Sequence, residues 1–278
     1  MILLGLAIMI VSELATLVGI EPFASWNTPI CWTGFIIFAD AFVYRVRRDS
    51  WIRSAPREFA ALALASIPLW VAFEGFNLVI RNWNYTGLPE NRALRLFGYA
   101  WSFATIWPAI FEGAELAAIA RAGRAGRAGG AGRKNTGTQA SAFSVAAGAA
   151  MLLAPSLVPR AIAPYMAAPV FLGFIFLLDP INRRMGAETL TRDRVVNLVW
   201  SGLLCGVLWE GWNYWARAKW HYTVPIMERV KIFEMPLPGY FGFPAFAVEC
   251  LTMYVFVRAL YCAVRYGRAG AAGRTIAL

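Results

Sequence analysis

Residues 58–80 read EFAALALASIPLWVAFEGFNLVI, a stretch of 23 residues in which Glu58 and Glu74 are the only charged side chains. About 20 mostly apolar residues suffice for a helix to cross a bilayer. The sequence therefore predicts an all-α, polytopic integral membrane protein of about eight transmembrane helices, because seven further stretches share this character. They are approximately residues 1–20, 28–45, 95–120, 141–159, 161–181, 195–216 and 237–264.

Prolines make one part of this assignment ambiguous. Pro155, Pro159 and Pro164 interrupt residues 141–181, and proline ends or kinks a helix. We expect either two spans or one bent helical hairpin in this region. The N-terminus is apolar from its first residues and has no basic segment before it, so a first transmembrane helix is expected there rather than a cleaved signal peptide.

The composition excludes several classes of protein. Of the 278 residues, 59% are apolar and 15% are charged, whereas a soluble domain has about 45–50% and about 25%. The mean hydropathy is +0.53. These values argue against a soluble enzyme, a disordered protein and a nucleic-acid binder, although the net charge is +10. The four cysteines show no metal-ligand spacing and are expected to be buried as small apolar residues.

The distribution of basic residues predicts the orientation. Seventeen lysines and arginines lie in segments 45–57, 121–140 and 183–194 and after residue 264, and eight lie in the alternate loops. Basic loops stay in the cytoplasm. We therefore expect a protein of the cytoplasmic (inner) membrane with both termini in the cytoplasm and with membrane lipid as its surroundings.

An internal repeat divides the chain. Phe73-Glu74-Gly75-Phe76-Asn77 matches Trp209-Glu210-Gly211-Trp212-Asn213, and the motifs around them keep the same order at offsets of 136 to 141 residues. Since each half holds four helices, both halves should enter the membrane in the same direction, as two tandem parallel four-helix repeats. The predicted units are a first repeat (1–120), a flexible Gly/Arg-rich cytoplasmic linker (121–140), a second repeat (141–266) and a flexible tail (267–278).

The repeated acids are the first candidates for chemistry. Carboxylates inside membrane helices are costly and usually functional. Asn77 follows Glu74 by three residues and Asn213 follows Glu210 by three, so each acid shares a helix face with an amide. We expect these four residues to be catalytic and to face one another across a central cavity. The alternative is that the acids form a satisfied polar network that only holds the halves together.

Other residues are candidates for substrate binding. Aromatic faces can stabilise a cation beside an acid, and such rings flank both repeated acids; Glu112 and Glu249 each follow an intrahelical proline, a break that often lines a polar cavity. The expected binding residues are Trp209, Trp212, Phe73, Phe76, Glu249, Glu112, Trp220 and Tyr222. Because the second half carries more tryptophan, we place the centre nearer Glu210. Asp40 and Asp179 are expected to act as caps or in ion pairs.

Metal and cofactor chemistry find no support. His221 is the single histidine, and the chain lacks a metal-ligand cluster, a phosphate-binding loop and a dinucleotide fingerprint. We expect no metal, no cofactor and no nucleic-acid partner.

One pattern resembles a known family. An aromatic-acid pair, eight residues and Trp-x-Tyr occur as Phe73-Glu74 to Trp83-Asn84-Tyr85 and, with one extra residue, as Trp209-Glu210 to Trp220-His221-Tyr222. This is similar to the tandem repeat of the membrane-embedded lycopene cyclase domain family and of the related integral membrane terpene cyclases. The resemblance covers about 15 residues of each half. It implies cofactor-independent, acid-initiated cyclisation of an isoprenoid, with Glu74 or Glu210 as the acid.

Three functions are left open by the residues themselves. An enzyme acting on an isoprenoid or another apolar lipid requires an apolar pocket beside the acid. A proton- or cation-coupled transporter or channel that uses Glu74 and Glu210 requires a water-accessible route past them. A non-catalytic membrane scaffold requires fully paired acids with no adjoining cavity.

Overall fold

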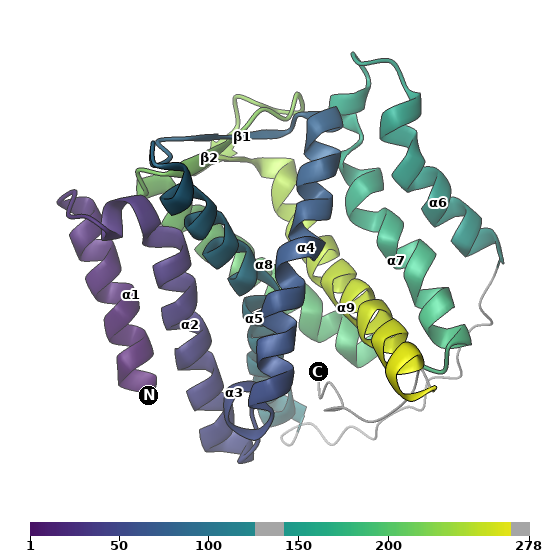
Figure 1. The fold of residues 1–278 in the computed structure, drawn as a ribbon, viewed down its shortest axis with the longest axis horizontal. Coiled ribbons are helices and arrows are strands. Elements are labelled where there is room, and N and C mark those ends of the chain that lie inside the picture. Colours follow the sequence, from purple (N-terminus) through teal and green to yellow (C-terminus); the bar gives the residue numbers. More distant parts are fainter. Residues whose placement is uncertain (126–141, 268–278) are drawn as a thin grey trace.

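The computed structural model describes residues 1–125 and 142–267, which form an all-α fold and so confirm the predicted class (Figure 1). Two short 3-10 helices, η1 (Ala163–Tyr165) and η2 (Leu237–Phe241), accompany the α-helices. The α-helices are α1 (Ile2–Leu17), α2 (Phe23–Arg47), α3 (Trp51–Ser54), α4 (Pro56–Ile80), α5 (Arg92–Ala125), α6 (Ala142–Leu157), α7 (Ala167–Arg184), α8 (Arg192–Trp215) and α9 (Gly242–Tyr266).

Five of the described helices are long and apolar enough to cross a membrane: α2, α4, α5, α8 and the continuous run of η2 and α9. Of the eight predicted spans, five thus coincide with helices that could cross a membrane. Helices α1 and α6 are apolar but contain 16 residues each, which at 1.5 Å per residue gives about 24 Å, less than the roughly 30 Å of a bilayer core. Residues 141–181 contain two separate helices, α6 and α7, joined through η1.

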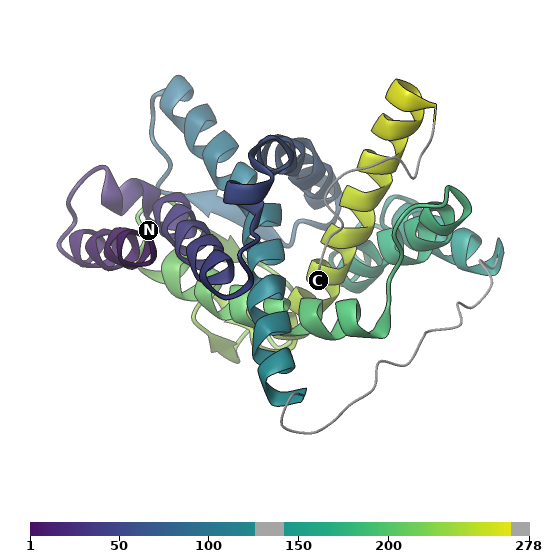
Figure 2. The same cartoon turned by 90° about the horizontal axis from the view of Figure 1, so that it is seen from below.

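Two helix pairs flank the molecule. Helices α1 and α2 pack together on one side, α6 and α7 on the other, and α4, α5, α8 and α9 lie between them (Figures 1 and 2). Each flanking pair meets through glycines. A Cβ on Gly5 would lie 2.5 Å from the carbonyl oxygen of Gly34, and one on Gly148 would lie 2.7 Å from that of Gly173. Small residues let membrane helices approach this closely.

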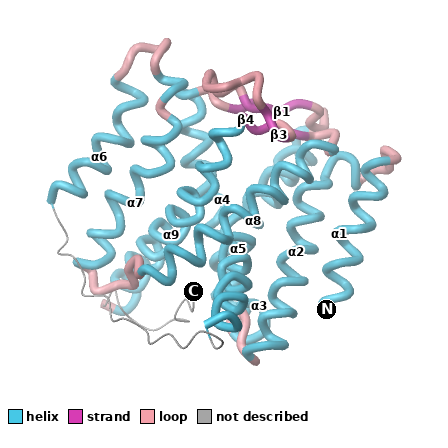
Figure 3. The backbone as a smooth tube through the Cα atoms, turned by 180° about the vertical axis from the view of Figure 1, so that it is seen from behind, coloured by secondary structure: helices cyan, strands magenta, loops and turns pink. Residues whose placement is uncertain are grey.

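Short strands close one end of the bundle (Figure 3). Strand β1 (Trp83–Thr86) pairs antiparallel with β2 (Lys219–Tyr222), so the two halves of the chain meet there. The register joins Trp83 to Tyr222 and Tyr85 to Trp220. Strands β3 (Lys231–Ile232) and β4 (Met235–Pro236) form a small hairpin beside β2. Helix α1 begins and α9 ends at the opposite end of the bundle (Figure 1).

Helix α5 extends past one predicted boundary. Helix α5 continues to Ala125, five residues past the expected end of the first repeat, so residues 121–125 are helical rather than part of a linker. The rest of the predicted linker and the tail from residue 268 lie outside the described residues.

All four cysteines are buried and free, as expected.

Candidate functional site

A cavity of about 560 Å³ lies beneath the paired strands β1 and β2, within the roughly 300–1,000 Å³ typical of small-molecule sites. Both halves of the chain contribute to its wall, which is mostly apolar and aromatic. Six of the twelve tryptophans line it: Trp26, Trp32, Trp70, Trp83, Trp209 and Trp220. The only charged residues on the described wall are Arg95 and Lys219, so the wall carries no carboxylate.

Glu74 lies behind this aromatic wall and is well satisfied. Its Oε1 accepts hydrogen bonds from Tyr85 Oη at 2.6 Å, Trp70 Nε1 at 2.8 Å and Trp83 Nε1 at 3.2 Å. All three donors line the cavity. A carboxylate with several donors is held in one position, so Glu74 fastens helix α4 to strand β1.

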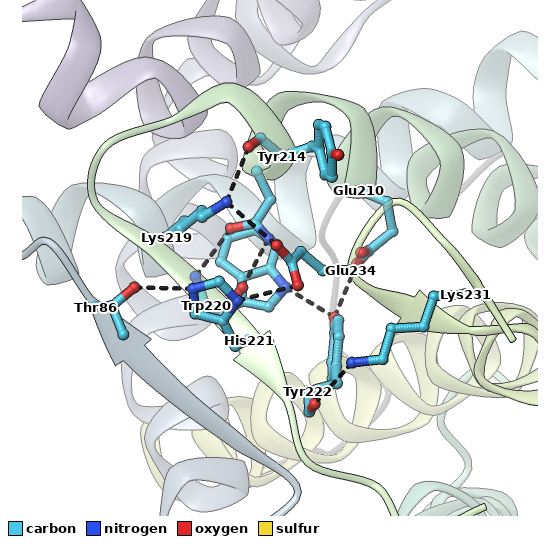
Figure 4. A network of polar contacts seen from close by, with 10 residues as sticks. Thr86, Glu210, Tyr214, Lys219, Trp220, His221, Tyr222, Lys231 and Glu234 are labelled. Atoms are coloured by element: carbon cyan, nitrogen blue, oxygen red, sulfur yellow. Dashed lines mark hydrogen bonds and ion pairs between the residues drawn. The ribbon is translucent and has the colours of Figure 1, made fainter. Parts of the chain in front are cut away.

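Glu210 occupies the matching place on α8 but has far fewer partners. It is 0% exposed, and its Oε1 accepts one hydrogen bond, from Tyr222 Oη at 2.9 Å (Figure 4). Trp220 Nε1 in turn donates to Tyr222 Oη at 2.9 Å. Oε2 of Glu210 has no hydrogen-bond partner among the described residues. Buried polar atoms rarely lack a hydrogen-bond partner. Oε2 is therefore the oxygen of Glu210 that is most available for proton transfer.

One sequence difference contributes to this asymmetry. Trp70 precedes Glu74 by four residues and donates to it, whereas Gly206 stands four residues before Glu210. The ring of Phe243 packs against Gly206, where a Cβ would lie 2.4 Å from Cδ2 of that ring. No indole can therefore reach Glu210 from this position, so Glu210 lacks a counterpart of the Trp70 bond. Its Oε2 lacks a donor for a second reason: Trp83 Nε1 also reaches Glu74 Oε2, at 3.4 Å, whereas Trp220 Nε1 donates to Tyr222 Oη.

The two asparagines serve the backbone of the strands. Asn213 Nδ2 donates to the carbonyl oxygen of Trp220 at 2.9 Å, and its Oδ1 accepts from Trp220 N–H at 3.0 Å. Asn77 makes the same pair of bonds to Trp83, at 2.8 and 3.2 Å. These bonds position the tryptophans and favour a structural role over the catalytic role expected for Asn77 and Asn213.

The tyrosines between acids and cavity stay protonated. Burial, followed by the charge of Glu74, raises the pKa of Tyr85 well above its usual value. Burial and the charge of Glu210 do the same for the pKa of Tyr222. Both hydroxyls are therefore available as hydrogen-bond donors throughout the physiological range.

The expected binding residues divide into two groups. Trp209, Trp220 and Tyr222 line the cavity, but Trp212, Phe73, Phe76, Glu112 and Glu249 do not. Trp212 contacts Trp32 edge-on at 4.8 Å between ring centroids, Phe73 stacks on Phe171 at 5.3 Å, and Phe76 contacts Phe174 at 6.1 Å. These rings belong to the packing between helices.

The second pair of acids is buried within the central helices. Glu112 on α5 is 1% exposed and Glu249 on α9 is 0% exposed. Glu249 Oε1 accepts from the backbone N–H of Phe174 at 3.3 Å, and its Oε2 has no partner among the described residues. The structure therefore does not bring Glu112 and Glu249 to the wall on which Trp209 and Tyr222 lie.

Asp40 and Asp179 hold the opposite end of the helices in the way expected for caps and ion pairs. Asp40 accepts from the backbone N–H of Ile52 at 2.7 Å, and Asp179 from that of Leu190 at 2.9 Å. Asp179 also pairs with Arg183 at 3.5 Å. Asp40 pairs with Arg53 at 4.0 Å.

A charged network ties the β3–β4 hairpin to strand β2 (Figure 4). Glu234, in the turn of the hairpin, lies 3.2 Å from Lys219 Nζ and 3.0 Å from His221 Nδ1. Burial raises the pKa of Glu234, but the hydrogen bonds and charges of His221 and Lys219 outweigh it, so the net shift is downward. Met235 and Pro236, which follow, line the cavity, so this network holds part of the cavity wall in place.

We expect Glu234→Gln to loosen the hairpin. Because the pKa of Glu234 is lowered by folding, its contribution is present above the unfolded value of 4.5 and is lost as the pH falls through the lower folded value. At pH 7 the variant loses the partly exposed ion pair with Lys219, worth about 0.2–1 kcal/mol, and a carboxylate contact of His221 Nδ1. Amide hydrogen exchange of residues 223–236 should be faster in the variant than in the wild type at the same pH. Equal exchange in the two proteins would contradict this assignment.

Three residues of the site lie outside any motif that marked them as functional: Trp70, Trp26 and Arg95. Trp83 and Tyr85 belong to the Trp-x-Tyr motif. Trp70 fits an interfacial aromatic belt, although its four-residue spacing from Glu74 places the two side chains on one helix face. Trp26 and Arg95 are isolated in the sequence. Within the described residues, no three histidine, cysteine, aspartate or glutamate side chains lie close enough together to hold a metal ion.

Comparison of the chain with protein-family models, with curated proteins and with solved structures finds no match.

Proposed function

We propose that this protein is a membrane enzyme that binds an isoprenoid or a similar apolar lipid in the aromatic cavity and cyclises it. The observation that carries the proposal is the cavity itself: about 560 Å³ of apolar and aromatic wall, with Tyr222 on that wall hydrogen-bonded to the under-satisfied Glu210 behind it. Apolar walls with a few convergent polar groups are typical of small-molecule sites.

The proposed chemistry starts at Glu210 in its acid form. In the resting site the hydroxyl of Tyr222 donates to Glu210 Oε1. In the proposed step this hydrogen bond reverses: Glu210 donates its proton to Tyr222 Oη while Tyr222 gives its own proton to a double bond of the lipid, so the pair acts as one general acid. The faces of Trp209 and Trp220 stabilise the carbocation that forms. Ring closure and return of a proton to the pair complete the cycle, so substrate and product are isomers and no cofactor is consumed.

Repeated contacts support the proposal that the two halves are copies of one four-helix module in the inner membrane. The asparagine bonds to Trp83 and Trp220 are the same, and the register of β1 and β2 has twofold symmetry. The glycine contacts of the flanking helix pairs also correspond. In this arrangement both termini lie in the cytoplasm and the strands lie on the outer side.

The alternatives fit the site less well. An aqueous transport route past Glu74 and Glu210 needs polar walls, but the cavity beside both acids is apolar. A scaffold needs paired acids without an adjoining cavity, but Glu210 Oε2 has no partner among the described residues. The geometry therefore favours a lipid site over transport and over a scaffold.

We expect a specific lipid to co-purify with the protein. Organic extracts of the detergent-purified wild type and of Ala245→Phe should be compared by chromatography and mass spectrometry. Ala245 lines the cavity, so the new ring should occupy it and reduce the bound lipid at least tenfold. Ala61→Phe, on the exposed face of α4, is the matched control and should keep the lipid. If wild type and Ala245→Phe carry the same lipids, the proposal fails, and proton flux in vesicles becomes the next measurement.

A further inference from the structure

The charge on the cavity wall is all of one sign. Lys219 and Arg95 are its only charged residues in the part of the chain that the structure describes. Lys219 is neutralised by Glu234 at 3.2 Å. Arg95 makes no ion pair with any described residue. A half-buried guanidinium that faces an apolar cavity without a carboxylate partner has an unused capacity to bind an anion.

Hydrogen-bond donors gather around Arg95. Arg95, Gly98, Tyr99 and Ser102 recur every three to four residues on α5 and all line the cavity, so they form one face of the helix. Opposite this face, the buried Nε1 of Trp26 has no hydrogen-bond partner among the described residues. A Cβ on Gly98 would lie 3.2 Å from this nitrogen, so the indole N–H lies beside the same face.

The polar face continues into an apolar one. Phe103 and Ile106, the next cavity-lining residues along α5, are apolar, and Phe246 of α9 also lines the wall. The cavity thus has a positively charged, donor-rich part where α5 begins and an aromatic part deeper in the bundle. This division matches an amphiphile in which an anionic group and a long apolar chain are joined.

We infer that the lipid bound in this cavity carries an anionic oxygen group, a phosphate or a carboxylate, which Arg95 and the Trp26 indole bind. The inference rests on the proposed function, in which an apolar lipid fills the cavity, and it narrows the substrate class. Arg95 holds the charged end of the molecule, so that the chain extends past Phe103 toward Tyr222. Arg95 is a binding residue and takes no part in proton transfer.

The test compares three C20 probes that differ only at the head: geranylgeraniol, geranylgeranyl phosphate and geranylgeranoic acid. Each is titrated into the full chain in a non-ionic detergent, and quenching of the cavity tryptophans gives the affinity. We expect the two anions to bind at least about tenfold more tightly than the alcohol, since charge-assisted hydrogen bonds are strong. The tighter of the two anions identifies the head group.

Variants separate the charge from the cavity. Arg95→Gln should remove the preference for anions and leave the affinity for the alcohol unchanged, whereas Arg95→Lys should keep part of the preference. Arg92→Gln, at an exposed cation one turn earlier on α5 that does not line the cavity, should keep all of it. If the alcohol binds as tightly as the anions, or if Arg95→Gln retains the preference, the inference fails while the lipid site stands. If none of the three probes binds, the proposed function fails as well.

Discussion

Glutamine at position 210 should slow lipid conversion by about 10²–10⁴-fold, which is the usual contribution of a general acid. Glutamine has nearly the shape of glutamate and can still accept the hydrogen bond from Tyr222 Oη, but it has no proton to give. The unconverted isomer should therefore accumulate in membranes that express Glu210→Gln. Chromatographic retention measures this, because the mass of substrate and product is the same.

Two matched variants control for folding. Asp40→Asn changes a buried carboxylate at the opposite end of the bundle, where it accepts from the backbone of Ile52, and should leave conversion unchanged. Glu74→Gln alters the acid that accepts from Trp70, Trp83 and Tyr85, so we expect it to lower stability more than rate. If Glu210→Gln and Asp40→Asn lose activity equally while both remain folded, Glu210 is not the acid.

Much of the helical fold could be predicted from residue type alone. The eight apolar stretches correspond in order to α1, α2, α4, α5, α6, α7, α8 and α9. Two of them, α1 and α6, are too short for a span because hydropathy averaged over a stretch does not locate helix ends: α1 ends at Leu17 and α6 at Leu157. Helix α7 has 18 residues, but its last turns carry Asp179, Arg183 and Arg184. The position of a helix end depends on a local turn, such as those at Gly19 and Pro159, and a turn is set by only one or two residues.

The site could be predicted only in part, because it depends on side-chain packing that no local stretch of sequence contains. Glu74 and Glu210 stand out because carboxylates are rare in apolar helices. Which of them lacks donors depends on Trp70, which Gly206 replaces in the second half, and on whether the strand tryptophan donates to the acid or to a tyrosine. Trp26 and Arg95 lie 69 residues apart in the sequence, and the packing of α2 against α5 brings them to one cavity. No local pattern contains that contact.

The pairing of β1 with β2 explains why an asparagine follows each acid. Asn213→Ala should lower the free energy of unfolding by about 2–6 kcal/mol, since each buried polar group left without its partner costs about 1–3 kcal/mol and both the N–H and the carbonyl of Trp220 lose one. Asn213 itself is 0% exposed, so water cannot replace the amide easily. Thermal unfolding in detergent, followed by tryptophan fluorescence, measures the loss.

The pattern of variants distinguishes this structural role from a catalytic one. Asn213→Asp keeps the acceptor for Trp220 N–H but loses the donor to its carbonyl oxygen, and should fall between alanine and wild type in stability. Asn84→Ala, on the exposed side of β1, should melt like the wild type. A catalytic amide would instead give Asn213→Ala a normal melting temperature and a lost activity, and that result would return Asn213 to the reacting centre. With Trp220 displaced, Tyr222 loses the indole donor that orients it toward Glu210. Asn213→Ala should therefore lower both the stability of the fold and the rate of proton transfer from Tyr222.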